Sequence, residues 1–91
     1  MLSSLRAALP EIRRRWPIRA LGIFGSTARN EARPDSDLDI LVDFERPVGL
    51  TAFLELENRL QAVAGRKVDL VSRPALKRHM SRNIMRDLIW L

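Results

Sequence analysis

The hydrophobic and polar positions of this chain change period several times, which predicts helices and strands in alternation. Apolar residues recur at helical spacing over 3–15 and over 50–63, where Gly65 is expected to end the helix. Three shorter apolar runs bounded by turn residues are predicted to be strands: 18–25, 37–44 and 67–71. The pattern therefore predicts an α/β fold, a small mixed β-sheet flanked by helices.

Other elements are predicted at the remaining positions. Pro10 is expected to kink or divide the first helix, and a short helical turn is predicted around 27–32. A last amphipathic helix is predicted to begin near Pro74 and to carry one apolar stripe: Leu76, Met80, Ile84 and Leu88. Because the apolar surface widens over 84–91, we expect this helix to contact a partner protein.

Length and composition restrict the class of protein. A chain of 91 residues is expected to form a single domain, 1–91, and the absence of cysteine excludes disulfides and thiolate metal sites. No signal peptide or membrane span is evident, so a cytoplasmic protein is expected. The net charge of +5 favours anionic partners, but aromatic residues make up 5% of the chain and do not alternate with the basic ones, which disfavours a nucleic-acid-binding surface.

A pair of aspartates at the start of a predicted strand needs an explanation. Asp37 and Asp39 lie at i and i+2, so their side chains are expected on one face, while Leu38 and Ile40 face the core. A neighbouring strand is expected to bring Asp69 beside them. Clustered carboxylates repel one another unless a hard cation such as Mg²⁺ neutralises them. The sequence therefore predicts a metal site.

The Gly-Ser pair upstream is suited to binding phosphate. Gly25 is predicted to end a strand and Ser26 to begin a helical turn, where backbone N–H groups and a hydroxyl are placed to bind an anion. A triphosphate held there would reach the carboxylate site. We therefore expect two-metal in-line displacement at an α-phosphate, with Asp69 activating the nucleophile.

These residues resemble the minimal nucleotidyltransferases of the polymerase-beta-like superfamily. The signature of that family is Gly-Ser, ten residues and Asp-x-Asp, and here Gly25-Ser26 and Asp37-Leu38-Asp39 match it without insertion. The stretches "FGSTARNEARPDSDLDILVDFE" and "GRKVDLV" resemble its core motif and its third-carboxylate strand. Asn30 departs from the usual Gly of the family.

The resemblance implies a polymerase-beta-like nucleotidyltransferase fold and an antitoxin role. Members of this size commonly pair with a helical ribonuclease toxin of the higher-eukaryote-and-prokaryote nucleotide-binding type. They transfer AMP from ATP to a tyrosine of that toxin. The resemblance also implies that antitoxin and toxin would form an oligomer together. By this likeness, Asp37, Asp39 and Asp69 would be the catalytic residues and would bind two Mg²⁺ or Mn²⁺ ions, and Asp69 would alternatively be the base. Gly25, Ser26 and Arg29 would bind the nucleotide. The alternatives are a non-catalytic antitoxin that inhibits its toxin by stoichiometric binding, and a small nucleic-acid-binding domain.

The remaining distinctive residues have simpler interpretations. Asp43 shares the face of Asp37 but lies further along the strand, and is expected to be solvated. His79 is expected at the surface. Trp16 and Trp90 are expected to pack in the fold, although Trp90 would alternatively anchor a partner.

Overall fold

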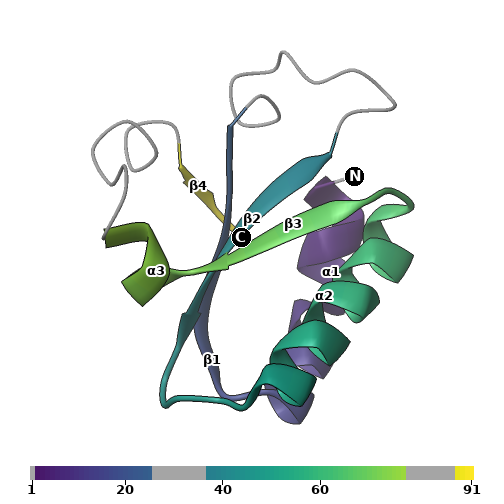
Figure 1. Ribbon diagram of the computed structural model, residues 1–91. Coiled ribbons are helices and arrows are strands. Elements are labelled where there is room, and N and C mark those ends of the chain that lie inside the picture. Colours follow the sequence, from purple (N-terminus) through teal and green to yellow (C-terminus); the bar gives the residue numbers. More distant parts are fainter. Residues whose placement is uncertain (1, 26–36, 78–87) are drawn as a thin grey trace.

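The computed structural model describes residues 2–25, 37–77 and 88–91, which form a mixed four-stranded sheet with helices (Figure 1). The strand order is β3-β2-β1-β4, in which β1 pairs antiparallel with β2 and β4, and β2 pairs parallel with β3. The strands are β1 (Ile18–Phe24), β2 (Leu38–Phe44), β3 (Val68–Ser72) and β4 (Ile89–Trp90). The predicted fold class is confirmed.

Two helices, α1 (Leu2–Arg15) and α2 (Leu50–Ala64), lie together on one face of the sheet (Figure 1). Helix α1 continues past Pro10 to its end, so the expected division of this helix does not occur. Gly65 ends α2 in the left-handed conformation (φ 71°), and its N–H donates to the Gln61 carbonyl, as the sequence predicts. A short helix, α3 (Arg73–Lys77), follows β3.

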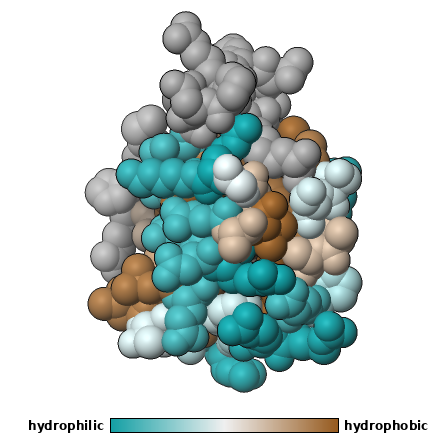
Figure 2. Space-filling model, turned by 90° about the vertical axis from the view of Figure 1, so that its right-hand side faces the viewer, coloured by the Kyte–Doolittle hydropathy of each residue, from teal (hydrophilic) through white to brown (hydrophobic). Residues whose placement is uncertain are grey.

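The main core lies between this helix pair and the sheet. Alternate strand residues face the helices, and the core contains Leu5, Ile12, Leu21, Ile23, Leu38, Ile40, Val42, Leu56, Leu60, Val68 and Leu70. Trp16 joins the core as predicted: it is 4% exposed, and its indole N–H donates to the Ala52 carbonyl at 3.0 Å. Viewed from the helix side, the surface is mostly hydrophilic (Figure 2).

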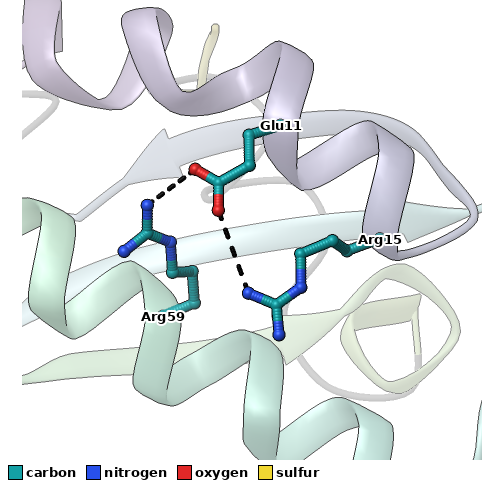
Figure 3. Close-up of polar contacts among 3 residues, drawn as sticks. All are labelled: Glu11, Arg15 and Arg59. Carbon is teal, nitrogen blue, oxygen red and sulfur yellow. Dashed lines mark hydrogen bonds and ion pairs between the residues drawn. The ribbon is translucent and has the colours of Figure 1, made fainter.

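An ion-pair triad joins the two long helices (Figure 3). The Glu11 carboxylate of α1 accepts a 2.6 Å hydrogen bond from Arg59 of α2, and its other oxygen lies 3.8 Å from Arg15. The hydrogen bond from Arg59, more than the neighbouring positive charges, holds the pKa of Glu11 below its ordinary value of 4.5, although desolvation opposes this. The triad therefore stabilises the α1–α2 contact only while Glu11 is ionised.

The end of the chain is a strand, which corrects one prediction. Residues 78–87 lie outside the described part, and with them the predicted helical positions Met80 and Ile84. Residues 88–91 are not helical: β4 pairs with β1 through Gly22↔Trp90 and Ile23↔Ile89, and the Leu91 N–H donates to the Leu21 carbonyl. Apolar residues at the end of the chain suited a helix stripe, but here they complete the sheet beside β1.

Trp90 lies over Gly22 and remains 40% exposed. A Cβ at Gly22 would approach the Trp90 ring to 3.0 Å and a Leu88 methyl carbon to 2.7 Å. The missing side chain therefore lets the terminal strand dock. In the described part of the chain, no helix has the length and apolar content needed to cross a membrane.

Candidate active site

Asp39 and Asp69 lie directly opposite each other in the parallel ladder between β2 and β3. Their neighbours Leu38, Ile40, Val68 and Leu70 are buried against the helices, so the two carboxylates belong to the other face of the sheet. We call this the second face. The sequence predicted the arrival of Asp69 beside Asp39, and this prediction is confirmed. Like charges directly opposite each other oppose pairing, so this arrangement is suited to a cationic ligand.

Gly25 lies beside this carboxylate pair. It follows β1, whose last residue Phe24 is the register partner of Asp39. Gly25 has φ 74°, and a Cβ built on it would clash with the Asp39 carboxylate. Glycine is therefore required twice here, for the left-handed backbone and for the close approach. The Gly25 backbone therefore lies directly against the Asp39 carboxylate.

Asp37 lies at the same end of the sheet, one residue before β2. Its side chain is 54% exposed, and its Oδ2 is 4.0 Å from Nζ of Lys67. The carbonyl of Lys67 accepts a 2.9 Å hydrogen bond from the N–H of Leu38, which fixes the start of β3 beside the start of β2. Lys67 was not among the residues predicted from the sequence, although its place directly before the strand of Asp69 was the available signal.

The topology thus brings Gly25, Asp37, Asp39 and Asp69 to one end of the sheet. Ser26 and Arg29, the other predicted site residues, lie outside the described residues, as do His79 and Asn30. Among residues 2–25, 37–77 and 88–91, no three His, Asp or Glu side chains are grouped closely enough to hold a metal ion.

The donor set nevertheless fits Mg²⁺. This ion binds proteins through one or two carboxylates and completes its shell with waters and substrate phosphates. Asp39 and Asp69 supply two such carboxylates, and Gly25 itself contributes no side chain beside Asp39.

Asp43 is buried, which contradicts the prediction that it is solvated. It is 8% exposed, and its Oδ2 accepts a 3.0 Å hydrogen bond from Arg73 at the start of α3. Between this ion pair and the Asp39–Asp69 pair, the second face carries a small apolar cluster of Phe24, Leu41, Val71 and Leu88. Asp43 therefore has a structural partner and lies apart from the carboxylate site.

A groove of about 660 Å³ lies at the opposite end of β2 from the carboxylates. Its lining includes Phe44, Phe53 and Leu50, and Leu50 is 73% exposed. None of the three predicted metal ligands lines it. This groove is therefore separate from the carboxylate site.

Comparison with known proteins decides the family. The family described as nucleotidyltransferase domain matches residues 5–91. The chain belongs to this family. It is a nucleotidyltransferase, as the resemblance of the Gly-Ser and Asp-x-Asp motifs implied.

Individual members of the family match over nearly the whole chain. The sequence is 44% identical over 89 residues to the protein adenylyltransferase MntA of Thermococcus cleftensis, covering 98% of this chain and 90% of that relative. A solved structure of a candidate minimal nucleotidyltransferase matches with a TM-score of 0.78 and 38% identity, over 99% of this chain and 95% of the other.

A more distant structure shares the fold. A complex of a tri-AMPylated Shewanella oneidensis HEPN toxin with an MNT antitoxin matches with a TM-score of 0.72 and 20% identity, over 99% of this chain and 71% of that chain. The nucleotidyltransferase fold that the motifs implied is confirmed by the family match and by the minimal nucleotidyltransferase structure at 38% identity.

Proposed function

We propose that this protein transfers AMP from ATP to a hydroxyl group, by likeness a tyrosine, of a partner ribonuclease toxin in a Mg²⁺-dependent reaction, and that it acts as the antitoxin. The observation that carries the proposal is Asp39 opposite Asp69, with the Gly25 backbone against Asp39. Such an arrangement supports the proposal because the Gly25 backbone would be able to approach a phosphate bound beside the carboxylates. The Thermococcus relative, named as a protein adenylyltransferase, supports the choice of AMP and of a protein acceptor.

Each residue has a role in this proposal. Asp37, Asp39 and Asp69 would hold divalent ions, which when bound neutralise the triphosphate and the leaving pyrophosphate. Gly25 and Ser26 would hold the phosphates through backbone N–H groups and the Ser26 hydroxyl, and Arg29 would contact them. The acceptor oxygen forms its bond to the α-phosphorus as the bond to pyrophosphate breaks. As base, the Asp69 carboxylate would take the hydroxyl proton.

The test measures both proteins by mass. The purified protein, its partner toxin, Mg²⁺ and labelled ATP are incubated together, and intact-mass spectrometry records any adenylyl group gained by the toxin. Asp39→Asn is the matched variant, because it removes one negative charge and keeps the shape of the side chain. Transfer by the parent and none by Asp39→Asn is the expected result.

An inhibited toxin of unchanged mass would overturn the catalytic proposal. That outcome would favour the alternative in which the antitoxin neutralises its toxin by stoichiometric binding. Equal inhibition of the toxin by Asp39→Asn and by the parent would also favour stoichiometric binding over catalysis.

A further inference from the structure

The strand that carries Asp69 lies at the edge of the sheet, and side chains of α2 hold its outer side. Among the strands of the described residues, only β2 neighbours β3, so alternate N–H groups of β3 point away from β2. The Val68 N–H donates to Oε1 of Gln61, and the Leu70 N–H donates to Oε2 of Glu57, both at 3.1 Å. These two amides flank Asp69, so its strand is held on both sides.

The spacing of the two acceptors matches the spacing of the two donors. Glu57 and Gln61 are one helical turn apart, about 6 Å along the axis, and Val68 and Leu70 are about 6.6 Å apart along a strand. The helix and the strand edge therefore fit each other at two points. A shift of β3 along the sheet would break both hydrogen bonds together.

The helix that supplies these acceptors is itself fixed. Leu56 and Leu60, the residues directly before Glu57 and Gln61, are fully buried in the core. Arg59 of the same turn donates to Glu11 of α1, and the Gly65 cap ends the helix four residues after Gln61. The acceptor side chains therefore start from a backbone with little freedom to move.

We propose that Glu57 and Gln61 are positioning residues that set the place of the Asp69 carboxylate opposite Asp39. The inference rests on the proposed role of Asp69 as a metal ligand or base. Asp69 is exposed and stands on an edge strand, so packing alone does not fix it. Two hydrogen bonds from its neighbours to a rigid helix restrict the backbone that carries the carboxylate, as outer-shell contacts do for metal ligands.

The test separates positioning from general support of the fold. In Glu57→Met with Gln61→Met, side chains of similar length remain, and both acceptors are lost. Binding of Mn²⁺ alone is measured from the electron paramagnetic resonance signal of the free ion, and hydrogen exchange is followed at the Leu70 amide. Glu57→Gln keeps an acceptor oxygen, and Glu55→Met removes an exposed carboxylate from the same helix.

We expect the double variant to stay folded, to exchange its Leu70 amide faster and to bind Mn²⁺ about tenfold more weakly, at the lower end of outer-shell effects. Glu57→Gln is expected to recover most of the affinity lost in Glu57→Met, and Glu55→Met to bind as the parent does. Gln61→Met alone provides a milder variant if the double variant unfolds.

Two results would overturn the inference, and they are distinguishable. Unchanged Mn²⁺ affinity in a folded double variant with faster Leu70 exchange would show that the hydrogen bonds serve only the fold. Equal Mn²⁺ affinity in the parent and Asp69→Asn would refute the proposed role of Asp69, and the inference with it.

Discussion

Asp43 and Arg73 form an ion pair one step beyond the last pair of the ladder that sets Asp39 opposite Asp69. The two charged pairs therefore lie four residues apart, one between β2 and β3 and the other between β2 and the first residue of α3. One is repulsive and lies at the proposed site, and the other is attractive, with Asp43 buried. The attractive pair offsets the like-charge pair and favours this register over a slipped one.

Removing the cation of this pair is expected to destabilise the fold. Arg73→Met leaves the Asp43 carboxylate buried without its partner, and we expect a loss of about 1–3 kcal/mol in the free energy of unfolding, moderated by the partial exposure of Arg73. Urea denaturation measures it. Arg46→Met, at an exposed arginine of the same region, is the control and should change stability by less than about 0.5 kcal/mol. A stable Arg73→Met would contradict the role given to the ion pair.

Alanine substitutions at two glycines distinguish the effect of backbone strain from an effect on ligand binding at the proposed site. Gly25→Ala and Gly65→Ala both place alanine at positive φ, at a cost of about 1–2 kcal/mol each. At Gly65 the added methyl group meets nothing within 4 Å, whereas at Gly25 it meets Asp39. We therefore expect both variants to melt earlier, and only Gly25→Ala to lose the stabilisation that Mn²⁺ with ATP gives the parent. Equal ligand-induced shifts in the two variants would argue against Gly25 at the site.

The geometry of the site was largely predictable because strands have a period of two. The Asp-x-Asp spacing fixed which residues faced the core, and the short "KVDLV" run offered a single carboxylate to a neighbouring strand. The Gly-Ser spacing placed Gly25 at the same end. What the sequence did not show was the contact of Gly25 with Asp39, which depends on antiparallel register.

The missed features depend on contacts between distant segments. Asp43 looked solvated because its partner Arg73 lies 30 residues further along the chain and meets it only through the parallel crossover. Glu57 and Gln61 looked like ordinary polar positions of an amphipathic helix. The strand β4 was predicted as part of a helix because a strand of two residues is too short to show an alternation of apolar and polar positions.

Removing a carboxylate from the repulsive pair should not harm the ligand-free fold. Asp69→Asn is expected to leave the free energy of unfolding unchanged or slightly higher, since Asp69 is exposed and faces Asp39. In the same melting assay, Mn²⁺ with ATP should stabilise the parent more than the variant. A large loss of ligand-free stability would assign Asp69 a structural role in place of the proposed one.

The Glu11 triad predicts a dependence of stability on pH. Because the pKa of Glu11 is lower in the folded state, the unfolded chain binds the proton more readily. The stabilisation is complete above the ordinary value of 4.5 and is lost as the pH falls through the folded pKa. Glu11→Gln should therefore be less stable than the parent at pH 7, and the difference should narrow below pH 4.5.

Chemical denaturation at a series of pH values measures this difference. Glu55→Gln, at an exposed carboxylate of α2, is the control and should follow the parent throughout. A constant difference between Glu11→Gln and the parent from neutral to acid pH would show that the triad does not depend on the charge of Glu11.

The hydrogen bonds of Glu57 and Gln61 to β3 also affect how this sheet meets other chains. An edge strand with free N–H groups is a template for a foreign strand, and such addition leads to both peptide binding and aggregation. At Val68 and Leu70 the donors are already bound to α2, and a strand from another chain would have to displace both side chains first. Recognition of a partner by strand addition is therefore disfavoured at this edge, and so is growth of the sheet into larger aggregates.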